Sequence, residues 1–353
     1  MRADLNLFPE RPMHETDSQD AATPRARPPL VLATKIVPPR LPAGLIERPR
    51  LVRFAAGAEN KRLTVIKAPA GFGKTSLALT WLQPLRARGV SVAWLSIDAG
   101  DDEPVRFVYH LAQALRHACG NVGESAIGLA AAASLAPARS IISALINELA
   151  AIDDEVCIFL DDYHLISLPA VHDALWFLIE NMPSRVHVVL CTRMAPPLPL
   201  ARLRAGNGLL ELDVSMLRFD FEETRRFVEH EHPGKLQPAS IKSLFAHTEG
   251  WAAALRIAAS VLSRESGKPH TELAPPSGAS YPFAAYLQDM VDRLPSPMVE
   301  FMLRTSILDR LNASLCEAIT GLRTSQRMLD EIAEGQLLLQ PLDCDGQWVR
   351  YWR

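Results

Sequence analysis

The feature that most constrains this chain is the stretch KAPAGFGKTSL, residues 67–77. A β-branched apolar run, RLTVIKA, precedes it, and TSLALTWL after it has the character of a helix. Gly-Lys-Thr at a strand-to-helix turn is typical of the phosphate-binding loop G-x-x-x-x-G-K-[ST], although Ala68 stands where that pattern begins with glycine. We expect the loop to work, because Ala68 is small and the first glycine mainly eases the turn. The alternative is a chance Gly-Lys-Thr, which the strand and helix around it disfavour.

A loop of this kind binds phosphate through its backbone. The N–H groups of the tight turn and of the helix N-terminus point at the anion, and Gly71 and Gly73 let the chain approach it closely. Lys74 would reach the β- and γ-phosphates, and the Thr75 hydroxyl would bind Mg²⁺. The predicted nucleotide-binding residues of the loop are Ala70, Gly71, Phe72, Gly73, Lys74, Thr75 and Ser76.

The rest of the first half of the chain alternates strands with helices. Apolar strands are expected at 91–97, 156–162, 186–193 and 209–215, with helices between them, one opened by Pro104 after Asp101 and Asp102 as cap candidates. This alternation predicts an α/β P-loop NTPase fold, a parallel sheet with helices on both faces. Ligands of such sheets bind at the carboxyl ends of the strands.

Three charged side chains lie at the ends of two of these strands. In FLDDYH (159–164), Asp161 would hold Mg²⁺ and Asp162 would orient or deprotonate an attacking water. In LCTR (190–193), Arg193 would stabilise charge on the transferred phosphoryl group. The alternatives are a pair of solvated turn acids and a surface arginine.

The chain is expected to divide into four segments. Residues 1–29 are polar and aperiodic, which predicts a disordered tail, and 30–215 form the NTPase domain with a proline-rich lead-in. A D-x-x-E capping box, Asp220 with Glu223, opens a helical domain at 216–280. The last segment, 281–353, is a small, mostly helical domain.

Composition excludes several other classes of protein. The net charge of −3 provides no general attraction to nucleic acid or to an anionic membrane, and no apolar run is long enough to span one. The five cysteines form no C-x-x-C pair, which favours a reduced, cytoplasmic protein without zinc.

The order of the motifs resembles a known family. ATKIVPPRLPAGLIERPRL (33–51), the loop, FLDDYHLI, CTRMAPPLPLARLRA and TEGWAAALRIA (248–258) run as in the maltose-regulon activator (MalT) family of LuxR-type transcription regulators, in the STAND class of signal-transducing NTPases. The resemblance covers about residues 33–351, and Ala-Pro-Ala-Gly in place of a leading glycine is usual in the family.

The resemblance implies a switch in which ATP and ADP stabilise different arrangements of an NTPase, a helical and a winged-helix domain, the last at 281–353. It implies phosphate and Mg²⁺ binding by the loop, Asp161 and Asp162 as the acid pair, and Arg193 as the sensor. Ile46 and Arg48 would lie near the base. Self-association, or association with another regulator chain, is the expected partnership.

Three departures from the family pattern stand out. Ala252 replaces a proline after Gly-Trp, and Trp352 stands where a histidine is usual. The superhelical repeat and helix-turn-helix domains are not in this sequence, so we expect no direct DNA binding from this chain.

Three functions remain open at this point. The first is an ATP/ADP-binding regulatory module that hydrolyses slowly at most. The second is a stand-alone ATPase with a small-molecule substrate, although no second catalytic constellation is evident. The third is a degenerate scaffold that binds no nucleotide.

Overall fold

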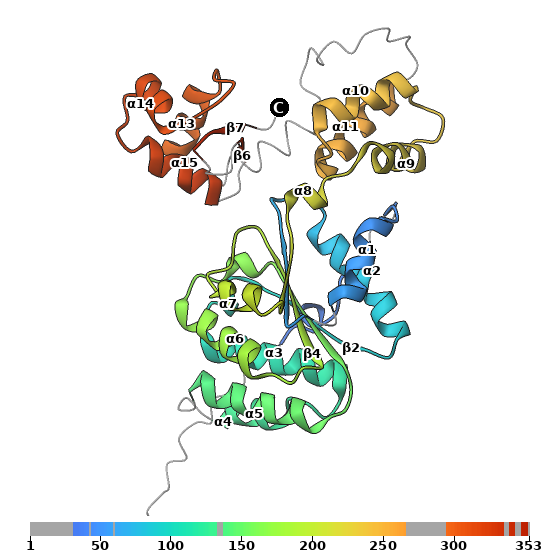
Figure 1. The fold of residues 1–353 in the computed structure, drawn as a ribbon, viewed down its shortest axis with the longest axis vertical. Helices are drawn as coiled ribbons and strands as arrows, with labels where there is room; N and C mark the ends of the chain where they lie inside the picture. The colour runs from blue at the N-terminus through green and yellow to red at the C-terminus, as the bar shows by residue number, and fades with distance from the viewer. Residues whose placement is uncertain are drawn as a thin grey trace, which may run out of the picture.

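A computed structural model describes residues 31–41, 44–58, 61–132, 137–265, 294–334, 339–342 and 347–351 of the chain. These residues form three parts: an α/β part with a parallel sheet, a group of helices, and a small α/β part at the end of the chain (Figure 1). The predicted tail at 1–29 and the predicted boundary near 280 lie outside the described residues.

The sheet confirms the predicted alternation. Its strands are β1 (Leu63–Lys67), β2 (Ser91–Ser96), β3 (Val156–Asp161), β4 (Val186–Thr192) and β5 (Leu209–Leu212). They run parallel in the order β2-β3-β4-β1-β5. The fifth strand is shorter than 209–215, because Asp213 accepts hydrogen bonds from the N–H groups of Ser215 and Met216 and starts helix α8 (Val214–Leu217).

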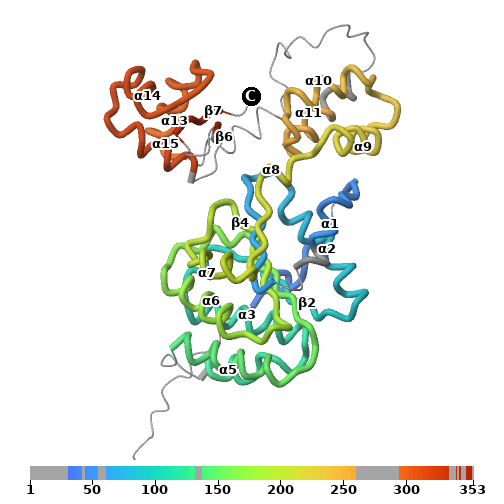
Figure 2. The backbone as a smooth tube through the Cα atoms, viewed as in Figure 1, coloured from blue at the N-terminus to red at the C-terminus, as the bar shows by residue number. Residues whose placement is uncertain are grey.

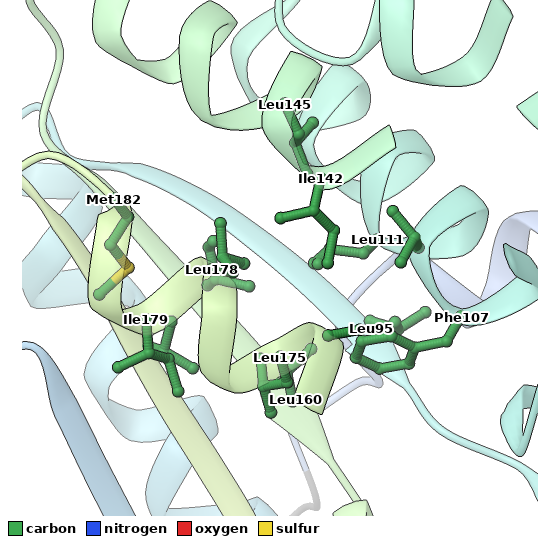
Figure 3. Packing of buried hydrophobic residues seen from close by; sticks show 14 of the residues in the cluster. Leu95, Phe107, Leu111, Ile142, Leu145, Leu160, Leu175, Leu178, Ile179 and Met182 are labelled. Atoms are coloured by element: carbon green, nitrogen blue, oxygen red, sulfur yellow. The ribbon is translucent and has the colours of Figure 1, made fainter. Parts of the chain in front are cut away.

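Helices cover both faces of the sheet (Figure 1). The helices on one face are α3 (Pro104–Cys119), α4 (Glu124–Ala132), α5 (Ala138–Ala151) and α6 (Pro169–Asn181); those on the other are α1 (Pro49–Ala58) and α2 (Lys74–Ala87). Leu95 and Leu160 of the sheet meet Phe107, Leu111 and side chains of α5 and α6 in the larger core (Figure 3). Because the strands are buried on both faces, they are almost continuously apolar, as parallel strands should be.

The start of α3 differs from the prediction. Asp101 and Asp102 do not cap the helix; Glu103 does, accepting from the N–H of Val105 at 3.0 Å and of Arg106 at 2.7 Å. Asp101 is fully buried and pairs with Lys35 at 2.6 Å. This ion pair fastens the lead-in segment, which includes η1 (Ala33–Lys35), to the end of β2.

The second part is a helical bundle that comes after α8 (Figure 2). It contains α9 (Phe221–Glu231), α10 (Pro238–Thr248) and α11 (Ala252–Glu265). The predicted capping box is confirmed: Asp220 accepts from the Glu223 N–H at 2.7 Å and Glu223 accepts from the Asp220 N–H at 3.2 Å.

The third part has helices α13 (Ser296–Thr305), α14 (Ala313–Thr320) and α15 (Ser325–Glu334) and an antiparallel pair, β6 (Leu339–Pro341) with β7 (Val349–Tyr351). Phe301, Leu311 and Ile332 are buried in its core. Three helices followed by a hairpin are the layout of a winged helix. Among the described residues, none of the helices has the length and apolar character needed to cross a membrane.

Candidate functional site

The phosphate-binding loop connects β1 to α2 at the carboxyl edge of the sheet. Gly71 and Gly73 have φ angles of 78° and 80°, in the left-handed region that glycine adopts without strain. The loop is tied to the neighbouring strand β4, because the Ala68 N–H donates to the Thr192 carbonyl at 3.3 Å. Ala68 is buried where the usual pattern has glycine, and the turn is made without positive φ there.

The loop leaves a set of backbone donors unused. Within the described part of the chain, the N–H groups of Gly71, Gly73, Lys74 and Thr75 have no hydrogen-bond acceptor. Unused N–H groups at a helix N-terminus carry partial positive charge. This arrangement fits a nucleotide phosphate chain, whose oxygens would accept from these groups.

Lys74 begins helix α2 and is buried. Its Nζ donates to the Pro69 carbonyl at 3.0 Å, so the ammonium group lies over the loop itself. Burial, and secondarily Arg193, lowers the pKa of Lys74 to about 8, although Asp161 and Asp162 act in the opposite direction. The ammonium group is therefore still charged at neutral pH and is available to an anion.

Thr75 and Asp161 meet as a Mg²⁺ site requires. The Thr75 hydroxyl donates to Oδ1 of Asp161 at 3.0 Å, across from the first turn of α2 to the end of β3. Burial, and then the charge of Asp162, raises the pKa of Asp161 to about 6. Thr75 and Asp161 are the residues that would hold Mg²⁺, whose charge would offset the cost of ionising the buried carboxyl group. Among the described residues, no group of three or more His, Cys, Asp or Glu side chains is placed to hold a metal ion.

Asp162 is held in an unusual backbone conformation. Its φ of 57° and ψ of 35° lie in the left-handed region, which is strained for a residue other than glycine. Its half-exposed carboxylate lies 3.8 Å from Nδ1 of His164. That nitrogen is buried without a hydrogen-bond partner, and burial, followed by the charge of Arg193, lowers the pKa of His164 to about 4. His164 was not predicted as a site residue, because its only signal in the sequence is its position two residues after the acid pair.

Arg193 comes directly after β4, which lies between β1 and β3 in the sheet. Strand β2 comes between β1 and β3 in the sequence, but in the sheet it lies at the edge, on the other side of β3. Arg193 therefore leaves the sheet between the loop on one side and the acids on the other, and its charge acts on both Lys74 and His164. The parallel order thus brings the predicted acids, arginine and loop to one edge.

The helical part contributes a contact to the site that was not predicted from the sequence. Trp251, predicted to be a core or interface residue, donates from Nε1 to the Ala70 carbonyl at 3.1 Å and stacks on Phe72 with ring centroids 6.1 Å apart. The Ala253 N–H donates to the Gly71 carbonyl at 3.0 Å. The two carbonyls of the loop are therefore held by the start of α11. The sequence feature that could have indicated this contact is the TEGW motif.

Ile46 and Arg48 lie between the lead-in and the helical bundle. Ile46 is buried against α9, α10 and α11. Arg48 donates to the carbonyls of Leu217 and Arg218, both at 2.8 Å, and pairs with Glu223 at 3.0 Å. These contacts give both residues a role in joining two parts of the protein, and a contact with the base stays a prediction.

The fold has counterparts among solved structures. The Walker-type ATPase PABY2304 of Pyrococcus abyssi matches 87% of this chain and 93% of its own, with a TM-score of 0.58 and 12% sequence identity. This fold, with the loop, the acids and the strand order described above, defines the α/β part as a P-loop ATPase fold.

The sequence comparisons identify the family. Residues 287–353 match the MalT winged helix domain. The chain is 32% identical over 308 residues to the HTH-type transcriptional regulator MalT of Cronobacter sakazakii and 33% identical over 331 residues to the serine/threonine-protein kinase PknK of Mycobacterium tuberculosis. The chain is a MalT-like protein. The matches cover 87% and 93% of this chain but only 34% and 30% of those relatives, so it spans about a third of their length.

Proposed function

We propose that this chain is the nucleotide-dependent switch of a MalT-like transcription regulator, binding ATP or ADP with Mg²⁺ in the cytoplasm and hydrolysing ATP slowly at most. One observation carries the proposal: unused loop N–H groups, a buried lysine and a Thr75–Asp161 pair lie together at one edge of the sheet. The similarity to MalT supports the regulatory role. LuxR-type and STAND membership would follow, as would self-association or association with another chain that binds the DNA.

Each residue of the site has a chemical task in this proposal. The loop N–H groups and Lys74 would bind the phosphates, and Thr75 and Asp161 would hold Mg²⁺, which supplies positive charge near the phosphoryl oxygens. Asp162 would position a water, and Arg193 would stabilise developing charge and sense the terminal phosphate. Trp251 and Ala253 each donate a hydrogen bond to the loop, and this pair of contacts, the loop clamp, connects the site to the helical bundle.

The first test is the nucleotide content of the purified protein. The protein is denatured and the released nucleotide is identified by chromatography, with Lys74→Ala prepared in parallel. We expect ADP or ATP at close to one per chain, and none in the variant, because the substitution removes the charge that binds the phosphates. An unchanged affinity in Lys74→Ala would show that the loop is assigned wrongly.

Turnover and thermal stability separate the two other functions. A stand-alone ATPase would turn over well above about 1 s⁻¹, within the range of ordinary enzymes. A degenerate scaffold would show no thermal stabilisation by Mg-ATP or Mg-ADP, whereas a site at 100-fold saturation adds about 2.7 kcal/mol. The replacement of the family's proline by Ala252 does not favour the degenerate scaffold, because the neighbouring Trp251 and Ala253 make the contacts with the loop.

A further inference from the structure

Glu249, directly after helix α10, is bound by arginines from two distant parts of the chain. Arg218, at the end of α8, approaches its Oε2 at 3.4 Å, and Arg350, in strand β7 of the winged helix, donates to its Oε1. Each of the three side chains is 24% exposed, so the group is shielded from solvent more than most surface ion pairs. One carboxylate therefore joins the winged helix to the helical bundle.

The backbone next to Glu249 cannot adjust freely. Glu249 itself has a φ of 47°, and Gly250 has a φ of 76°. A Cβ on Gly250 would lie 2.2 Å from the Phe219 carbonyl oxygen, and the Phe219 N–H donates to the Gly250 carbonyl at 2.9 Å. Only glycine fits this turn, so a tightly constrained stretch of backbone connects Glu249 to Trp251.

The start of α11 is the clamp on the phosphate-binding loop. Trp251 comes directly after Gly250 and binds the Ala70 carbonyl, while Ala253 binds that of Gly71. The contact with β7 is therefore two residues from the contact with the loop. No side chain of the winged helix needs to touch the nucleotide for the two to influence each other.

We infer that Arg350 couples the position of the winged helix to the nucleotide affinity of the loop, through Glu249 and Trp251. The inference rests on the proposed function in that the ligand is a nucleotide. When β7 moves away, Glu249 loses one of its two arginines and the clamp loosens; when the loop is rearranged by its ligand, the same turn changes the hold on Arg350. Such coupling is reciprocal by thermodynamic necessity.

The test measures the binding of mant-ADP to the whole chain in wild type, Arg350→Gln, Glu249→Gln and the double variant. Arg350→Gln is expected to raise the Kd about 5-fold, at the lower end of typical coupling. The double variant is expected to match Glu249→Gln, because that substitution already removes the contact with Arg350 along with that of Arg218. Arg327→Gln is the matched control: it breaks an exposed pair with Glu331 inside the winged helix and should leave the Kd unchanged. Equal Kd values for Arg350→Gln and Arg327→Gln would overturn the coupling, and so would additive effects in the double variant.

A second measurement decides the inference without any nucleotide. Hydrogen exchange of the peptide containing Trp251 and Ala253 is compared between Arg350→Gln and Arg327→Gln in the ligand-free protein. Faster exchange only in Arg350→Gln supports the coupling, and identical exchange overturns it. If wild type binds no mant-ADP, the proposed function fails by itself, and the exchange result still establishes or refutes the connection between β7 and the loop clamp.

Discussion

Lys74 and Asp161 are both buried in the site, with pKa values shifted toward neutrality. Burial is the main cause for both: it lowers the pKa of the ammonium group to about 8 and raises that of the carboxyl group to about 6. Each group is costly to keep charged in the free protein, and each would gain a partner if Mg-nucleotide binds as proposed. The site is thus prepared for a ligand that carries both a cation and phosphate oxygens.

The lowered pKa of Lys74 predicts a pH dependence of binding. Only the protonated form attracts phosphate, so the affinity for Mg-ADP should be constant between about pH 7 and 8 and fall up to tenfold per unit above that. Isothermal titration between about pH 7 and 10 would measure this. Lys74→Arg should lack the alkaline decline, because arginine does not titrate in this range. A decline that persists in Lys74→Arg would assign it to another group.

Asp162 is predicted to act in hydrolysis and not in binding. Its carboxylate is half-exposed and makes no contact with Thr75, unlike that of Asp161. Asp162→Ala should therefore keep the Kd for Mg-ATP within about twofold and reduce single-turnover hydrolysis by about two orders of magnitude or more, as expected for loss of a general base. Asp153→Ala, in the exposed turn before β3, serves as the control. Loss of binding in Asp162→Ala would place this residue with the metal.

Helix α11 packs in the helical bundle and also contacts the phosphate-binding loop. Its first turn carries the N–H of Ala253 to the loop, and the residue before it places the Trp251 ring against Phe72. The loop consequently has its N–H groups directed to a ligand and two of its carbonyls bound by another part of the protein. This division of contacts would let the bundle respond to the occupancy of the loop.

Removing one hydrogen bond at this contact tests its importance. Trp251→Phe keeps an aromatic ring beside Phe72 but removes the donor to Ala70. We expect a loss of about 1 kcal/mol, measured as an approximately fivefold higher Kd for mant-ADP or as lower stability. Trp176→Phe, in helix α6 on the opposite face of the sheet, should leave the Kd unchanged. Equal Kd values in the two variants would limit Trp251 to packing.

At the scale of the whole molecule, the lead-in segment joins the sheet to the helical bundle. Lys35 anchors the segment at the sheet, and Arg48 and Arg50 continue it to Glu223 in the helical bundle. Burial raises the pKa of Glu223, but its hydrogen bonds with the two arginines outweigh this and leave the pKa below its usual value. The stabilisation is present above the unfolded pKa of the carboxyl group, and it is lost as the pH falls through the lower folded value.

Truncating this carboxylate should loosen the connection between the sheet and the bundle. Glu223→Ala leaves two arginines without their shared partner, which costs about 3 to 5 kcal/mol for a buried pair. Urea unfolding should show the loss, with the bundle unfolding before the sheet. Glu222→Ala, the exposed neighbour on α9, should change stability by less than about 0.5 kcal/mol. Equal effects of the two variants would mean that the lead-in does not join the parts.

Local chemistry in the sequence determined the elements and the loop. The apolar strands, the Gly-Lys-Thr turn, and the Asp220–Glu223 box were predictable because each depends on neighbours within a few residues. The parallel class of the sheet was predictable too, and with it the meeting of Lys74, Asp161 and Arg193 at one edge, since the carboxyl ends of parallel strands share an edge. The family resemblance added the winged helix.

Only the tertiary structure decided which partners those elements take. Asp101 pairs with Lys35, more than sixty residues earlier, whereas Glu103 caps α3. Trp251 reaches the loop, and Arg350 reaches Glu249, across separations of about 180 and 100 residues. The short-range periodicity that predicts strands and helices does not predict such pairs, because they depend on how the folded helices and strands pack together. The contacts that would make this site a switch are of this second kind.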